Sequence, residues 1–204
     1  MRVELAPGSP MSEAQLMERF GFTKPAVRAA LARLRAEGLV LAEPRRGHVV
    51  APLTMRDVLE IYDVRLALEP AAAEAAAGKM DGGEIARLSK LAERGFDAGD
   101  AKAVERFLAA NREIHLAVVN AAGNQRAAAI VERLLDDSER ARILALRAGA
   151  AAGGQRARSE LQAVLAAIGE GDGARARELM ADAIRVFRDE LLERLQRATL
   201  DRPL

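Results

Sequence analysis

The spacing of apolar residues changes once along the chain, near residue 54. Before this point, two segments with helical spacing are followed by two short runs of β-forming residues; these four segments are 12–20, 23–38, 39–42 and 48–51. After it, apolar residues repeat at the helical period and are interrupted by Gly-containing turns. The pattern predicts a mainly α protein with two domains, residues 1–53 and 54–204.

The first domain carries local signals for two helices and a hairpin. Ser12 is the expected N-cap of the first helix, which Gly21 ends, and Thr23 is the expected cap of the second, where Pro25 is tolerated in the first turn. The expected buried faces are Leu16, Met17 and Phe20 in the first helix and Val27, Ala30, Leu31 and Leu34 in the second. Residues 43–47 then form a basic hairpin tip, and this order predicts a winged helix-turn-helix.

The second domain is predicted to be an all-α bundle of six or seven helices. Pro70 is expected to break or kink the first of them, because proline removes a backbone donor and crowds the preceding turn. The predicted helices are 54–78, 84–95, 100–121, 125–148, 156–169 and 173–198.

Composition and charge narrow the classes of function. The chain has no Cys, which excludes disulfides and Cys-based zinc sites, and its aromatic content of 3% offers no platform for stacking single-stranded bases. No apolar run reaches the roughly 18 residues that span a bilayer, so we expect a cytoplasmic protein. The formal charge is +1, but residues 1–54 carry +3 and the remainder −2.

The basic residues of the first domain suggest binding to double-stranded DNA. Thr23, Lys24 and Arg28 lie near the start of the second helix, where the helix dipole attracts phosphate, and Arg28 is the best single candidate for a base or phosphate contact. The hairpin residues expected to contact DNA are Arg45, Arg46, Gly47 and His48, although an isolated His is more often a packing residue in the wing. The alternative is that the helical cations form an ordinary solvated face.

Motifs along nearly the whole chain resemble the GntR family. The first domain resembles its winged helix at Pro7-Gly8, Met11-Ser12-Glu13, Leu16, residues 21–31, Leu34, Glu37-Gly38-Leu39-Val40 and residues 44–47. The second resembles the helical effector domain (FCD type) of the FadR subfamily at residues 61–70, 111–115, 121–124, 167–168, Gly171-Asp172 and Ala176. The resemblance implies a transcriptional regulator, more commonly a repressor, that binds a palindromic operator as a homodimer and responds to a small-molecule effector.

Two departures from the family pattern change these expectations. The family's winged helix normally opens with an additional helix before Pro7-Gly8, and only six residues precede it here. We therefore expect an N-terminally truncated chain, or a start assigned too late, with apolar helix faces short of a partner and weakened DNA binding.

The second departure concerns a divalent metal that members of this subfamily often hold in the bundle. By motif, the family's metal ligands fall on Asn111, His115, Leu161 and Ala183, and the last two cannot coordinate a metal. One amide and one imidazole are too few for a stable zinc site, so we expect no bound metal and no cofactor.

A metal-free pocket is the remaining expectation for the bundle. Arg65, Asn111 and His115 are the candidate effector-binding residues, in a cavity expected to be more apolar than the family's, or in a degenerate cavity without a ligand. Each also has a structural alternative: Arg65 pairs with Glu69 four residues later, His115 is a satisfied core residue, and Asn111 faces solvent.

The sequence gives little support for catalysis. It has no Gly-rich phosphate loop and no recognisable Ser/His/Asp arrangement, and Asp136-Asp137 with Ser138-Glu139-Arg140 has the composition of an exposed stretch. The alternative to a DNA-binding regulator is therefore a helical ligand-binding or dimerising protein whose truncated N-terminal module no longer binds DNA. An enzyme ranks below both.

Overall fold

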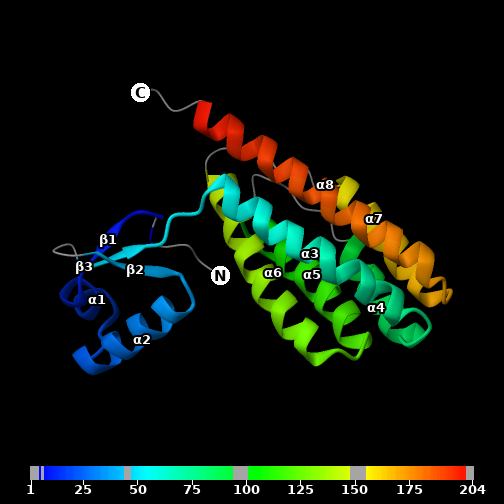
Figure 1. Ribbon diagram of the computed structural model, residues 1–204, viewed down its shortest axis with the longest axis horizontal. Coiled ribbons are helices and arrows are strands. Elements are labelled where there is room, and N and C mark those ends of the chain that lie inside the picture. Colours follow the sequence, from blue (N-terminus) through cyan, green and yellow to red (C-terminus); the bar gives the residue numbers. More distant parts are fainter. Residues whose placement is uncertain (1–4, 6, 44–46, 94–100, 148–154, 201–204) are drawn as a thin grey trace. The chain divides into compact units, whose positions relative to one another are not determined.

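The protein divides into two compact units in the computed structural model, Arg2–Thr54 and Met55–Leu204. The structure describes residues 5, 7–43, 47–93, 101–147 and 155–200 (Figure 1). Within these residues, eight helices and a small three-stranded sheet confirm the predicted mainly α fold class. We call the first unit the head and the second the bundle.

The head contains two helices and an antiparallel sheet in the order β1-β3-β2. Its elements are β1 (Pro10–Met11), α1 (Glu13–Phe20), α2 (Lys24–Ala36), β2 (Val40–Glu43) and β3 (Gly47–Val50). The β2–β3 hairpin was predicted with its boundaries shifted by one residue. The two-residue strand β1 was not predicted, because such a short strand exists only by pairing with β3, where Met11 lies opposite His48.

Local signals determine the helix boundaries of the head. The Ser12 side chain accepts a hydrogen bond from the Gln15 backbone N–H, and the Ser12 backbone N–H donates one to the Gln15 side-chain oxygen, which forms a capping box before α1. Gly21 ends α1 in the left-handed conformation. The head core consists of Met11, Val27, Leu31 and Val40, with Leu16, Met17 and Leu34 packed against it.

Two residues that were predicted to be buried in the head are exposed. Ala30 lies on the exposed side of α2, and Phe20 is 44% exposed and stacks on Phe22, with 6.4 Å between ring centroids. Helical periodicity assigns residues to a face, but whether a partner covers the edge of that face depends on tertiary packing.

The bundle consists of six helices among the described residues. They are α3 (Met55–Ala76), α4 (Gly82–Glu93), α5 (Ala101–Ala121), α6 (Gln125–Arg147), α7 (Gln155–Gly169) and α8 (Gly173–Leu200). The first and last run side by side (Figure 1), and α3 also packs against α5 and α6. Their interior is built from Ala, Val, Leu and Ile, including Val118, Leu165 and Ile184, all completely buried.

Of the break or kink predicted at Pro70, the break was wrong. The first bundle helix continues through Pro70 to Ala76 as one element. Pro70 is buried, and the Ala-rich segment that follows it favours helix strongly enough to continue beyond the missing backbone donor.

Among the described residues, no helix combines the length and apolar content needed to cross a membrane.

Candidate functional site

The N-terminal half of α2 presents an open polar surface on the head. Thr23 is the N-cap of α2, and its side chain makes no capping hydrogen bond. Thr23, Lys24 and Arg28 are all exposed, and the small residues Ala26 and Ala29 beside them are exposed as well. The three candidate side chains therefore lie together on a surface where the helix backbone can approach a groove closely.

Arg28 is held by a carboxylate in the free protein. Its Nε donates to Glu13 of α1 at 2.9 Å and 3.0 Å from the two carboxylate oxygens. The Arg28 side chain remains 63% exposed. Exposed ion pairs contribute only about 0–1 kcal/mol to stability. Glu13 therefore orients the Arg28 guanidinium, which can still leave Glu13 to bind another anion.

The hairpin is only partly described. Arg45 and Arg46 lie outside the described residues. Gly47 begins β3 with φ of +80°, a conformation that favours glycine, and a Cβ there would lie 3.3 Å from the backbone oxygen of Met11. His48 is half-buried and pairs with Met11 and Ala42 in the sheet, as expected of a wing-packing residue.

A polar cluster lies in the bundle, where three helices each contribute two polar residues spaced i and i+4; five of the six are buried and Arg142 is half-buried. These pairs are Arg65 and Glu69 on α3, Asn111 and His115 on α5, and Ser138 and Arg142 on α6. The i, i+4 spacing puts both members of a pair on one face of the helix, and here those faces point into the bundle. We call these six residues the polar cluster.

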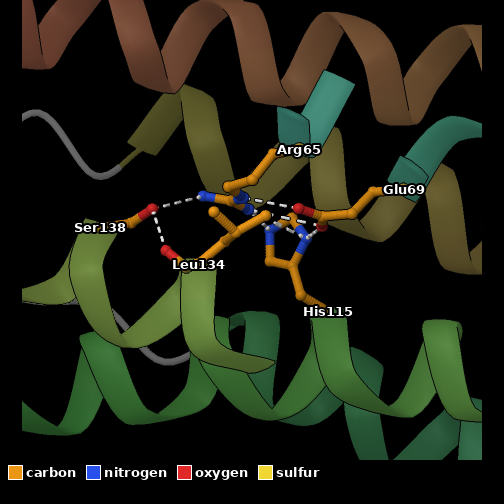
Figure 2. Close-up of polar contacts among 5 residues, drawn as sticks. All are labelled: Arg65, Glu69, His115, Leu134 and Ser138. Carbon is orange, nitrogen blue, oxygen red and sulfur yellow. Dashed lines mark hydrogen bonds and ion pairs between the residues drawn. The ribbon is translucent and has the colours of Figure 1, made fainter. Parts of the chain in front are cut away.

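Arg65 is the centre of the polar cluster (Figure 2). Its Nε donates to Glu69 at 2.5 Å, and its Nη1 donates to the Ser138 hydroxyl at 3.3 Å. Ser138 in turn donates to the backbone oxygen of Leu134 at 2.7 Å, which fixes its hydroxyl as an acceptor for Arg65. The Arg65 guanidinium also lies 5.1 Å from the centre of the Tyr62 ring.

His115 is neutral and donates a hydrogen bond to Glu69. Burial lowers the pKa of His115, and the neighbouring Glu69 carboxylate only partly offsets this effect. Its Nδ1 lies 2.5 Å from Glu69 Oε2, and a carboxylate only accepts, so Nδ1 carries the proton. The unprotonated Nε2 is then an acceptor, 3.5 Å from Arg65 Nη2.

Glu69 stays ionised despite complete burial. Burial by itself would raise the pKa of its carboxyl, but the Arg65 charge and hydrogen bonds from His115 and Arg65 outweigh that effect and lower the pKa to about 2. The expected alternative that Arg65 pairs with Glu69 therefore holds in the structure. Charged groups, Arg65 and Glu69, contact His115 in this part of the bundle.

Two members of the polar cluster have unused hydrogen-bonding atoms within the described part of the chain. Asn111 is 5% exposed, and its Oδ1 has no hydrogen-bond partner there. Arg142 Nη2 is likewise buried without a partner, while its guanidinium stacks over Phe187 at 4.1 Å from the ring centre. The alternative of a solvent-facing Asn111 was therefore wrong.

The residues do not fit the divalent metal that the family resemblance implies. Leu161 and Ala183 are buried and have no donor atoms. His115 uses Nδ1 for Glu69, and the Arg65 cation lies within 3.5 Å of both ring nitrogens. Across the described segments, no three His, Asp or Glu side chains come close enough together to hold a metal.

Sequence reasoning missed Ser138 and Arg142. The stretch around Asp136 was expected to be exposed, but Ser138 and Arg140 are 2% and 8% exposed. A detectable signal was the i, i+4 pair of polar residues at 138 and 142, which repeats the spacing of the pairs on α3 and α5.

Comparisons with known proteins follow the same two-unit division. Family models described as "Bacterial regulatory proteins, gntR family" and "FCD domain" match residues 1–50 and 60–186. The chain is 30% identical over 139 residues to the "Uncharacterized HTH-type transcriptional regulator YdhC" of Bacillus subtilis (strain 168), covering 68% of this chain and 62% of that protein. It is 28% identical over 140 residues to the "HTH-type transcriptional repressor RspR" of Escherichia coli (strain K12), covering 69% and 61%. These matches thus span about three fifths of each relative.

Solved structures show the same fold. The chain resembles E. coli McbR/YncC with a TM-score of 0.73 and 22% identity over 94% of this chain and 90% of that one. It resembles a putative GntR transcriptional regulator from Rhodococcus sp. RHA1 with a TM-score of 0.71 and 19% identity over 92% and 88%. With a winged helix in the head, a matching helical bundle and family models that together cover most of its length, the chain belongs to the GntR family of bacterial regulatory proteins and carries an FCD domain.

Proposed function

We propose that this protein is a cytoplasmic, sequence-specific DNA-binding transcriptional regulator. The observation that carries the proposal is the open surface of α2 in the head, where Thr23, Lys24 and Arg28 are exposed together at the helix N-terminus. A helix with this surface enters the major groove, and an arginine there takes guanine or phosphate in a bidentate manner. Arg45, Arg46, Gly47 and His48 are the proposed wing contacts.

A homodimer on an inverted repeat is the proposed binding unit. Two heads about one DNA turn apart gain affinity that one head lacks. The bundle, residues 54–204, supplies the dimer contacts and an effector site at Arg65, Asn111 and His115, while residues 1–53 bind DNA. The effector controls DNA binding by binding more tightly to one relative orientation of the two heads in the dimer. Repression of transcription is the proposed outcome.

Selection of genomic DNA fragments by the purified chain tests the proposal. We expect a short inverted repeat, bound with an affinity that falls steeply as salt rises because bound phosphates release their counterions. Arg28→Ala should weaken binding by about 1–3 kcal/mol. Arg56→Ala is the matched control, because Arg56 is another exposed arginine, on α3, that likewise pairs with a glutamate, Glu60.

Failure to enrich any fragment would favour the second candidate, a helical ligand-binding protein whose head does not read DNA. The exposed, stacked Phe20 and Phe22 are the observation that supports this candidate, because they show that α1 has an uncovered apolar edge. Equal effects of Arg28→Ala and Arg56→Ala would also contradict the assignment of α2 as the reading helix.

A further inference from the structure

Arg28 contacts Glu13 through only one edge of its guanidinium. Its Nε lies 2.9 Å and 3.0 Å from the two oxygens of the Glu13 carboxylate. Among the described residues, Arg28 makes no other side-chain hydrogen bond or ion pair, so both of its terminal nitrogens, Nη1 and Nη2, are open. Glu13 therefore occupies the inner edge of the guanidinium and leaves the outer fork free for another acceptor.

Glu13 is a well-fixed point from which to hold Arg28. It is the first residue of α1 and directly follows Ser12, whose capping box with Gln15 sets the start of the helix. A carboxylate in the first helical turn is also stabilised by the positive end of the helix dipole. The Glu13 side chain is 27% exposed and the Arg28 side chain 63%. The carboxylate is thus the sheltered member of the pair, and the guanidinium is the member presented to solvent.

The position of Arg28 on α2 is suited to reading bases. Arg28 lies four residues after Lys24, which puts both on one face of the helix, and both are exposed. In helix-turn-helix proteins, the N-terminal part of the second helix contacts base edges in the major groove. The open fork of Arg28 is therefore carried by the part of the head that reaches the bases.

The Glu13 carboxylate decides between the two DNA acceptors that suit an arginine. Guanine offers O6 and N7 to a forked donor, whereas adenine and cytosine place a donor in the same part of the groove. A phosphate oxygen carries a negative charge, which Glu13 beside the guanidinium repels. Glu13 balances the charge of Arg28 but leaves the directional hydrogen bonds of its fork, so the pair favours guanine, a neutral acceptor, over phosphate.

We propose that Glu13 is a positioning residue that holds Arg28 by its Nε, so that the Nη fork reads one guanine in each half-site of the operator. The inference rests on the proposed DNA-binding function and goes beyond it, because it gives Glu13 a role and commits Arg28 to a base in place of a phosphate. Glu13 itself does not touch DNA. It increases selectivity and lowers affinity for DNA of every sequence, since its charge repels phosphates.

Base substitution in the selected inverted repeat tests the contact made by Arg28. Each base pair of the half-site is replaced in turn, and binding of the full chain is followed by fluorescence anisotropy of labelled DNA. We expect one G·C pair whose replacement weakens wild-type binding at least about fivefold and has no further effect on Arg28→Ala. Replacing that guanine by 7-deazaguanine keeps the base pair but removes the N7 acceptor, so it should weaken binding only when Arg28 is present.

Two variants of Glu13 test its positioning role. An exposed ion pair shifts an equilibrium by no more than about fivefold, so Glu13→Met should reduce the preference for that guanine by about two- to fivefold. Glu13→Gln keeps an acceptor for Nε and should reduce the preference less. A variant that merely destabilised the head would lower the affinity for all sequences equally and leave the preference unchanged. Glu18→Met is the matched control, because Glu18 is an exposed glutamate on the same helix that Arg28 does not contact.

The restraint on Arg28 can also be measured in the free protein. Heteronuclear NMR resolves arginine Nε–H groups, and the Arg28 signal is the one that Arg28→Lys removes. We expect this Nε–H to exchange with solvent more slowly in the wild-type protein than in Glu13→Met, because the carboxylate accepts its hydrogen bond. Equal exchange in the two proteins would contradict the restraint.

The outcomes distinguish this inference from the regulator proposal. An unchanged guanine preference in Glu13→Met would overturn the positioning role of Glu13. Equal weakening of all sequences by Arg28→Ala, with a salt slope smaller by about one, would make Arg28 a phosphate contact. Either result overturns the inference while binding of an operator still supports the regulator proposal. Failure to enrich any DNA fragment would contradict both.

Discussion

Removing the Glu69 carboxylate should destabilise the bundle strongly. Glu69 is completely buried between Arg65 and His115, and its pKa lies at about 2 instead of 4.5. This difference corresponds to about 3 kcal/mol of stabilisation of the ionised form at pH 7. Glu69→Gln removes the charge but keeps the shape, leaves Arg65 as a buried cation without its partner, and should cost about 3–5 kcal/mol.

The chain provides a convenient probe for this measurement. Tyr62 is its one tyrosine and Trp is absent, so intrinsic fluorescence reports on the bundle and not on the head. Tyr62 is completely buried beside Arg65. Urea unfolding at pH 7, followed by this fluorescence, therefore gives the free energy of unfolding of the unit that contains Glu69.

Two further variants distinguish loss of the buried charge from general sensitivity to mutation. Glu74→Gln is the matched control, because Glu74 lies on the same helix and pairs with Arg177 at the surface, where it is 46% exposed. It should change the free energy of unfolding by about 1 kcal/mol or less. The double variant Arg65→Met with Glu69→Met replaces the pair by apolar side chains and should recover most of the loss. A cost below about 1 kcal/mol for Glu69→Gln would mean that Arg65 does not depend on Glu69 as its buried partner.

Three other predictions concern acid stability, DNA affinity and the wing. Because the pKa of His115 is lowered in the folded protein, the His115 imidazole takes up a proton in the unfolded chain before it does so in the folded one. The free energy of unfolding should therefore fall as the pH drops through the ordinary histidine pKa of about 6.5. The stabilisation from the Glu69 carboxylate should be lost at more acid pH, from 4.5 down to about 2. Urea unfolding from pH 8 to 5 checks this, and a flat profile would contradict the neutral His115. Glu13→Gln releases Arg28 and removes a negative charge beside the α2 surface, so it should raise DNA affinity in an electrophoretic mobility assay. Unchanged or weaker binding would contradict this prediction. Gly47→Val places a β-branched residue at a φ of +80° against the Met11 backbone and should destabilise the head by about 1–2 kcal/mol. Thermal unfolding of the head, followed by circular dichroism, should shift to lower temperature while the fluorescence of Tyr62 in the bundle is unchanged.

The local architecture is readable from the sequence because its signals are local. Ser12 and Gly21 mark the ends of α1 through contacts within one or two turns, and the apolar spacing of the bundle predicts its helices closely. The exposed cations at the start of α2 also follow from local information, since a helix N-terminus and its adjacent turn define their position. Pro70 is the exception, because packing and the Ala-rich segment keep that helix continuous.

Local signals in the sequence predict the helices, the winged head and the candidate DNA-binding surface of this GntR-family protein. Tertiary packing is needed to bring His115 and Ser138 to Arg65, because these two residues lie 50 and 73 positions after Arg65 along the chain. Each polar pair, taken alone, has the spacing of an ordinary surface ion pair or hydrogen bond. Whether such a pair faces solvent or the interior depends on which helices pack against it, and that is a property of the assembled bundle.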